Sequence, residues 1–370
     1  MTISIKQITL HHLQMKLKHP FTTSFGTVEN KDFYIIEMDD GEGHQGYGES
    51  VAFTAPWYTE ETFKTNGHMM RDFLIPLLLN NPIEHPDDVS KLFKSVKRNN
   101  MAKASLEGAV WDLYAKQEGM SLAKALGGTK LEVEAGIAIG MQPTIEQLLK
   151  KMETSIEQGY KRVKLKIKPG QDIEVLKEVR SHYPDLPIMV DGNSAYTLED
   201  MAHLKELDAF QLLMIEQPLA HDDIVDHAKL QSVINTPICL DESIHSLEDA
   251  KKAIELGSCK VINIKPGRVG GLTVAKQIHD YCVAKGVAVW CGGMLEAGVG
   301  RAQNIALSSL AGFEFPGDNA GSANYWEKDI IKPEVIAEKG IIKVQTSPGI
   351  GYVIDQEALV KFKIGEEIFS

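Results

Sequence analysis

The chain has 370 residues, of which 43% are hydrophobic and 24% are charged, so it is neither disordered nor collagen-like. At roughly 150 residues per domain, this length indicates two or three domains, one of which can be a large α/β barrel. The formal net charge of −12 argues against partners that attract basic proteins, so we expect neither nucleic acid nor an anionic membrane surface.

The first third of the chain predicts strands followed by helices. Residues 2–17 and 32–52 alternate apolar and polar side chains, as half-buried strands do, and a Thr- and Ser-rich loop from Pro20 lies between them. A helix is expected over about 59–77 and a stronger one over Met101–Glu118. This order of elements is typical of an α+β domain.

From about residue 133, short apolar strands alternate with amphipathic helices, which predicts βα units and a parallel sheet. Charged residues end five of these strands, the first four 25 residues apart and the last after 24: Lys166, Asp191, Glu216, Asp241 and Lys265. A closed barrel gathers such ends at one mouth, where barrel enzymes keep their active sites. An open doubly wound sheet would spread them along a ridge, so the barrel is favoured over that alternative.

The three carboxylates in this series predict a metal site. A single Asp or Glu after a strand is usually a helix cap or a solvated loop residue, but Asp191, Glu216 and Asp241 follow successive apolar strands in register. Clustered carboxylates repel one another and therefore need a cation. Their hard oxygens suit Mg²⁺, with Mn²⁺ as a substitute, better than zinc.

Lysines supply the second half of the predicted chemistry. Lys164 and Lys166 alternate with apolar residues, which is also typical of an edge strand with a solvated face, but inside a barrel this face meets the lumen. Two nearby ammonium groups lower each other's pKa, so that a lysine can act as a base near neutral pH. With a divalent ion, a lysine can remove the proton next to a carboxylate and form an enediolate.

The sequence resembles the enolase superfamily, whose sites combine a lysine or histidine base with Mg²⁺, in its muconate-lactonizing subgroup. The resemblance runs the length of the chain and is closest to the Gram-positive branch of o-succinylbenzoate synthases and N-succinylamino acid racemases. It rests on seven segments: SVAFTAPWYTEET from Ser50, NNMAKASLEGAVWDLYAK from Asn99, KLKIKPG from Lys164, MIEQPLA from Met214, CLDESI from Cys239, INIKPGRVGG from Ile262 and WCGGMLEAGVGRAQN from Trp290.

This resemblance implies a modified TIM-type (β/α)7β barrel with an α+β capping domain formed by the N-terminal third and the C-terminal tail. The capping domain is expected over residues 1–125, with 325–370 returning to it, and the barrel over 126–324. Because no apolar run is long enough to span a bilayer, we expect a cytoplasmic protein, and its four cysteines are expected to be buried and reduced. The expected partners are a small-molecule carboxylate substrate and further copies of the chain in a homo-oligomer.

The resemblance also implies individual roles. Lys166 corresponds to the acid/base lysine, Lys164 to its modulating neighbour and Lys265 to the lysine on the opposite face, while the three carboxylates correspond to the metal ligands. Arg268 is expected to favour the neutral form of Lys265, unless it lies on the surface. Residues expected beside the ligands are Asn193, Glu242 and Arg268, and those expected to bind the substrate are Phe25, Phe53, Trp57, Tyr58, Gly293, Met294 and Glu296.

Two capping-domain loops close over the substrate in this family, and here they correspond to 22–27 and 53–58. The aromatic residues of the second loop are open to a second interpretation, local packing, but substrate contact is favoured because a loop has little other reason to present them. The family usually has the four residues DANS where this chain has DGNS from Asp191, so Gly192 stands in place of an alanine. We expect this position to point away from the metal.

Three functions are compatible with these residues. The first is dehydration of 2-succinyl-6-hydroxy-2,4-cyclohexadiene-1-carboxylate to 2-succinylbenzoate, a step of menaquinone synthesis, with Lys166 as the base. The second is racemisation of N-acylamino acids, N-succinyl ones above all, in which Lys166 and Lys265 both transfer protons. A non-catalytic barrel is the third, and it is disfavoured because every acid, base and ligand position is filled.

Overall fold

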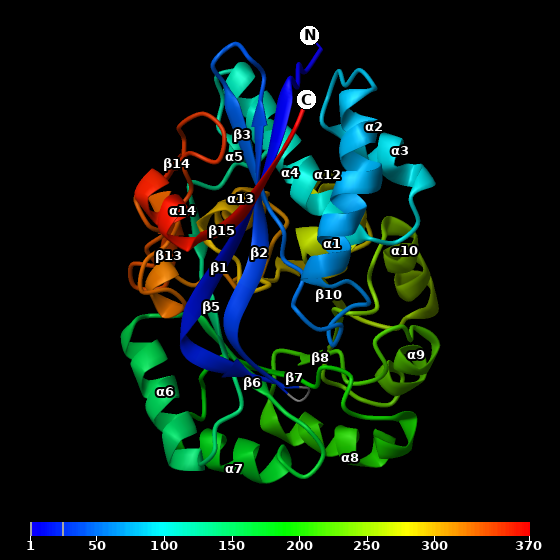
Figure 1. Ribbon diagram of the computed structural model, residues 1–370. Helices are drawn as coiled ribbons and strands as arrows, with labels where there is room; N and C mark the ends of the chain where they lie inside the picture. The colour runs from blue at the N-terminus through cyan, green and yellow to red at the C-terminus, as the bar shows by residue number, and fades with distance from the viewer. Residues whose placement is uncertain (1, 24–25) are drawn as a thin grey trace.

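The computed structural model describes residues 2–23 and 26–370 of the chain, arranged as a capping domain on a barrel (Figure 1). The cap is built on an antiparallel sheet whose strand order is β15-β1-β2-β3. Its strands are β1 (Gln7–Thr22), β2 (Thr27–Asp39), β3 (Gln45–Glu49) and β15 (Lys363–Phe369). β1 starts later than predicted but ends later as well, and β2 starts earlier, so part of the expected loop from Pro20 belongs to β1.

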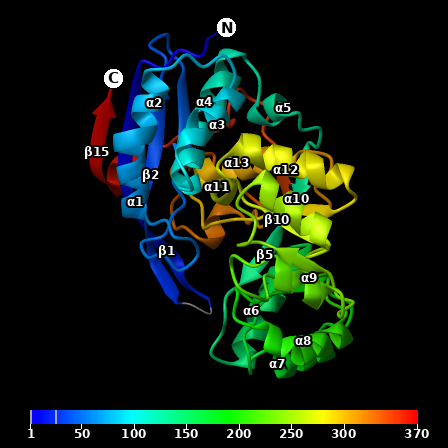
Figure 2. The same cartoon turned by 90° about the vertical axis from the view of Figure 1, so that its right-hand side faces the viewer.

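The cap also contains helices. They are α1 (Phe63–Met69), a π-helical turn (Met70–Leu74), α2 (Ile75–Leu79), α3 (Asp87–Leu92), α4 (Asn100–Gln117) and α5 (Leu122–Leu126). The second view shows α1, α2 and α4 on one side of this sheet (Figure 2). The helix predicted over 59–77 begins only at Phe63, because Thr62 forms a capping box with Thr65. Helix α4 contacts β3 closely, since a Cβ at Gly48 would lie 2.0 Å from the Ser105 carbonyl oxygen.

The barrel is a parallel sheet in which each strand is followed by a helix, as the alternating pattern predicted. Its strands are β5 (Gly136–Ile139), β6 (Arg162–Lys166), β7 (Ile188–Asp191), β8 (Ile215–Glu216), β9 (Ile238–Leu240), β10 (Val261–Ile264) and β11 (Ala288–Cys291). The helices are α6 (Ile145–Glu157), α7 (Ile173–His182), α8 (Met201–Glu206), α9 (Val225–Gln231), α10 (Leu247–Leu256), α11 (Pro266–Val269), α12 (Leu272–Ala284) and α13 (Gly298–Ser308).

An irregular segment closes the ring between β11 and β5. Phe313 forms a parallel bridge to Val289 of β11, and Gly317 forms one to Ala135, just before β5. The Asp318 amide also donates to the Cys291 carbonyl oxygen at 3.0 Å. This segment acts as the eighth strand, so the predicted (β/α)7β barrel is confirmed and the open doubly wound alternative is wrong.

The remaining C-terminal elements connect the two parts. β4 (Glu132–Glu134) pairs with β13 (Ile341–Lys343), β12 (Ile331–Lys332) pairs with β14 (Val353–Ile354), and α14 (Gln356–Phe362) precedes β15. Thus β15 joins the cap sheet, while the limits 1–125, 126–324 and 325–370 stay a prediction. All four cysteines are buried and free, as expected. In the described part of the chain, no helix has the length and apolarity needed to cross a membrane.

Candidate active site

Strand register brings the charged strand ends to one level of the barrel. Lys166 on β6 pairs with Asp191 on β7, which in turn pairs with Glu216 on β8. Asp241 directly follows β9, and Lys265 follows β10. Because β10 is four places from β6 in a ring of eight, the two lysines approach the lumen from opposite sides.

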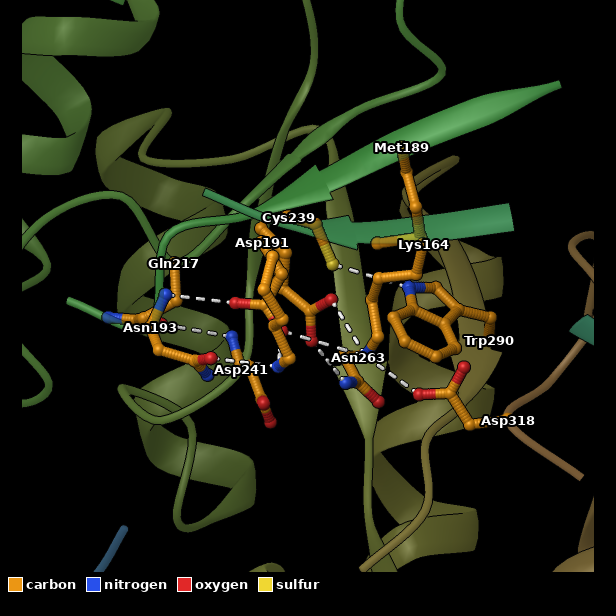
Figure 3. A network of polar contacts seen from close by, with 12 residues as sticks. Lys164, Met189, Asp191, Asn193, Gln217, Cys239, Asp241, Asn263, Trp290 and Asp318 are labelled. Atoms are coloured by element: carbon orange, nitrogen blue, oxygen red, sulfur yellow. Dashed lines mark hydrogen bonds and ion pairs between the residues drawn. The ribbon is translucent and has the colours of Figure 1, made fainter. Parts of the chain in front are cut away.

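Each of the three buried carboxylates is bound by a cationic side chain. Figure 3 shows part of this network, with Asp191, Lys164 and Asp318 among the labelled residues. The Lys166 ammonium lies 2.5 Å from Asp191 Oδ2. Glu216 Oε2 lies 3.2 Å from the ammonium of Lys164. Asp241 Oδ2 lies 2.7 Å from Lys265 Nζ, and its other oxygen binds the Arg268 guanidinium. These pairs compensate the charges that burial would otherwise penalise.

Lys164 occupies the most acidic surroundings of the site. Its ammonium lies 2.7 Å from Asp318, 3.2 Å from Glu216 and 3.7 Å from Asp191. Burial by itself lowers the pKa of Lys164, but these three carboxylates outweigh burial and raise it. The structure therefore differs from the expectation that neighbouring ammonium groups depress this pKa, because the carboxylates are closer and more numerous.

Lys265 is bound by a residue of the capping loop. Its ammonium lies 3.0 Å from the Tyr58 hydroxyl, which donates to Asp241 Oδ1 at 2.9 Å. Burial lowers the pKa of Lys265, but Tyr58 and the nearby Glu216 carboxylate raise it above its usual value. Arg268 is buried against Asp241 instead of lying on the surface. The surface alternative for Arg268 is thus wrong, whereas its effect on Lys265 stays a prediction, because the groups that raise this pKa are Tyr58 and acidic neighbours.

Amide side chains link the ligand candidates to one another. Asn193 Oδ1 accepts from Lys166 at 2.8 Å, and its Nδ2 donates to Glu242 Oε1 at 3.1 Å. Burial and the charge of Asp191 raise the pKa of Glu242. Asn263 Nδ2 donates to Glu216 Oε1 at 2.7 Å, so Asn193 and Asn263 orient groups on opposite flanks of the carboxylate row.

The donor chemistry of this row fits a hard divalent cation. Asp191, Glu216 and Asp241 supply carboxylate oxygens from successive strands, and the buried Asn263 Oδ1 and Glu242 Oε2 atoms have no hydrogen-bond partner. Within residues 2–23 and 26–370, however, no three His, Cys, Asp or Glu side chains converge closely enough to hold an ion. The reason is that each carboxylate turns toward its own Lys or Arg partner.

A cavity lies above the row and is partly open to solvent. The lining includes the three lysines and Asn193 together with predicted substrate-binding residues: Phe53, Trp57, Tyr58, Gly293, Met294 and Glu296. Phe25, also predicted, lies outside the described residues. Gly192 faces away as expected, since a Cβ there would meet Pro218 and Gln217.

Comparisons with known proteins agree with this geometry. Residues 5–127 match the family profile described as "Mandelate racemase / muconate lactonizing enzyme, N-terminal domain", and residues 147–358 match "Enolase C-terminal domain-like". The chain belongs to the enolase superfamily. Members of these two families are enzymes that depend on a divalent metal ion.

Similar members of the superfamily cover the whole chain. The o-succinylbenzoate synthase of Geobacillus kaustophilus is 57% identical over 369 residues, which are 100% of this chain and 98% of that protein. The N-succinylamino acid racemase of Thermus thermophilus is 44% identical, covering 94% of each chain. The structure of an enolase-superfamily protein from Listeria innocua superposes with a TM-score of 0.96 at 46% identity, covering 99% of both chains.

The site of this chain also contains residues that the sequence did not single out. Asp318 follows the eighth strand and binds both Lys164 and Arg162, the latter at 2.6 Å. Arg301 and Tyr325 line the same cavity, with the guanidinium carbon 4.8 Å from the tyrosine ring centroid. Arg301 lies within the quoted segment from Trp290, which gave a signal for it, whereas Asp318 and Tyr325 lie in segments without strand periodicity.

Proposed function

We propose that this enzyme dehydrates 2-succinyl-6-hydroxy-2,4-cyclohexadiene-1-carboxylate to 2-succinylbenzoate and also racemises N-succinylamino acids. The observation that carries the proposal is one cavity lined by two lysines on opposite sides of the barrel, above three buried carboxylates. The relatives named o-succinylbenzoate synthase and N-succinylamino acid racemase support both reactions. The second reaction is the alternative main role.

Lys166 is the proposed base. Its neutral amine takes the proton α to the substrate carboxylate, and the electrons of that C–H bond form the new ring double bond as the hydroxyl departs. The same Lys166, now protonated, gives its proton to the leaving hydroxyl, so that water is released. Asp191 and Asn193 hold the ammonium at 2.5 and 2.8 Å, which fixes its position at the cavity wall.

Lys265 is proposed to differ between the two reactions. In dehydration it stays protonated and stabilises negative charge on the substrate, as its raised pKa favours. In racemisation a proton must leave one face of the α-carbon and another must arrive at the opposite face, so both lysines transfer protons. Asp191, Glu216 and Asp241 would hold Mg²⁺, or Mn²⁺ in its place. The ion would neutralise the substrate carboxylate and acidify its α-proton.

Substitution of the two lysines tests the proposal. Lys166→Ala is expected to abolish both reactions, whereas Lys265→Arg should abolish racemisation and leave measurable dehydration, because the charge remains while the proton carrier is lost. The measurement is a paired assay with the cyclohexadiene carboxylate and N-succinyl-phenylalanine. If Lys265→Arg racemises at the wild-type rate, Lys265 is only an electrostatic partner and the two-base assignment fails.

We also propose that the chain forms a homo-oligomer. Val360, Ile364 and Ile368 are 57–66% exposed near the edge strand β15, an apolar surface that a second copy would cover. Light scattering of the purified chain measures the assembly, and a monomer at micromolar concentration would refute the proposal.

A further inference from the structure

The segment that carries Lys265 is a glycine-rich turn, residues 265–272, pressed against the capping domain. A Cβ at Gly267 would lie 2.4 Å from Cγ2 of Val51, and one at Gly271 would lie 2.4 Å from Oε2 of Glu107. A larger residue in place of either glycine would have to displace the part of the cap that it contacts. The glycines of this motif therefore permit an unusually close approach between turn and cap.

Helix α4 of the cap binds both ends of the turn. Near the first end, Asn100 Nδ2 donates to the Arg268 carbonyl oxygen and to that of His245, each at 2.9 Å. At the second end, the Glu107 carboxylate accepts from the amides of Leu272 and Thr273, at 2.7 and 2.8 Å. These are the first two amides of α12, which has no capping side chain of its own.

Backbone hydrogen bonds connect the rest of this turn to Lys265. The amides of Arg268 and Val269 donate to the Lys265 carbonyl oxygen at 3.0 and 3.1 Å. A displacement of the turn therefore moves the Lys265 backbone. Lys166, in contrast, lies on β6 within the barrel sheet and is held by Asp191 and Asn193.

We propose that Asn100 and Glu107 are positioning residues for Lys265, so that the capping domain controls proton transfer on one face of the substrate. The inference rests on the proposed two-lysine function and deepens it. Proton transfer depends steeply on the placement of the reacting atoms, so a small shift of the turn is enough to slow the step at Lys265. The step at Lys166 is independent of this turn.

Exchange of the α-proton in D₂O separates the two lysines. Each enantiomer of N-succinyl-phenylalanine presents its proton to one lysine, and Lys166→Ala and Lys265→Ala identify which enantiomer depends on which. Asn100→Asp is nearly isosteric and keeps a helix-favouring residue at the start of α4, but it removes both N–H donors. It is expected to slow the Lys265-dependent exchange about tenfold and to leave the other within about twofold.

Three further variants complete the test, each checked for native circular dichroism. Asn100→Ala removes the same donors without adding charge, and Glu107→Gln weakens the second anchor, so both should change the exchange ratio in the same direction. Asp112 lies on the same helix, beyond Glu107, and Asp112→Asn removes a carboxylate that accepts from the amides of Tyr47 and Ile350 instead of from the turn. This control should leave the ratio unchanged.

An equal loss of exchange for both enantiomers in the Asn100 and Glu107 variants, or an unchanged ratio, would overturn the inference while leaving the proposed function intact. A ratio that also changes in Asp112→Asn would overturn it, because general loosening of α4 would then be the cause. A wild-type enzyme that exchanges neither enantiomer would overturn the proposed racemisation and this inference together.

Discussion

At the scale of single residues, two buried cations share one carboxylate and one aromatic ring. Asp318 binds both Lys164 and Arg162, while the Trp290 ring lies 5.0 Å from the Lys164 ammonium and 4.7 Å from the Arg162 guanidinium carbon. The raised pKa of Lys164 keeps it charged. We therefore expect Lys164 to contribute a positive charge that favours a carboxylate substrate, and not to act as the base.

Trp57 is a second single residue with a testable role. It lines the cavity, and its ring stacks on that of Phe53 with ring centroids 4.5 Å apart. Trp57→Ala is expected to raise KM several-fold or to shift the preference among N-acyl substrates, since a large apolar contact is lost. Steady-state kinetics with N-succinyl and N-acetyl substrates measure this. A fall in kcat alone, equal for every substrate, would contradict the role in substrate selection.

At the scale of elements, a cap strand anchors a barrel helix. The Glu49 carboxylate ends β3 and accepts from the amides of Ala297 and Gly300, at 2.7 and 2.8 Å, where α13 begins. The same carboxylate is paired with the buried Lys31 ammonium. The favourable charge at a helix N-terminus thus comes from a segment about 250 residues away in the sequence.

Glu49→Gln is expected to lower the free energy of unfolding by about 3 kcal/mol, because Lys31 is left buried without its counter-charge. Urea unfolding followed by circular dichroism measures the change. Glu174→Gln is the matched control, since its partner Lys177 is exposed, and it should cost less than about 0.5 kcal/mol. Equal effects of the two substitutions would show that the Glu49 contacts are not specially stabilising.

At the scale of the whole molecule, the barrel core is formed independently of the ligand candidates. Trp290, Met189, Met214, Cys239 and Val261 pack together as a separate apolar cluster within it. The three carboxylates above them are each bound by a lysine or arginine. The fold is therefore charge-balanced at this site before any ion binds.

Chelation by excess EDTA is consequently expected to abolish turnover while the circular dichroism spectrum stays native and Tm falls by a few degrees at most. Addition of Mg²⁺ or Mn²⁺ should restore activity. Asp241→Asn should resemble the chelated enzyme even with Mg²⁺ present, because a neutral amide weakens a site built from anionic oxygens. Full turnover in EDTA would refute the metal site, and unfolding would show that the ion is structural.

By itself, the sequence determined the barrel and the ring of charged strand ends. The constant spacing of about 25 residues reflects the length of one βα unit, so residues at that interval occupy equivalent positions on consecutive strands. Lys166, Asp191 and Glu216 were therefore placed correctly in register by local periodicity alone. The capping box at Thr197 and the helix cap at Ser246 are local features of the same kind, because each involves residues three apart.

Only the tertiary structure decided which side chains surround those strand ends. Asp318 reaches Lys164 because an irregular segment closes the ring, and Tyr58 reaches Lys265 because the cap loop folds into the barrel mouth. Asn100 contacts the Lys265 turn across 168 residues of sequence. Such contacts have no local signature, since they depend on how the cap and the barrel pack together, and they set the charges and the positions of the lysines.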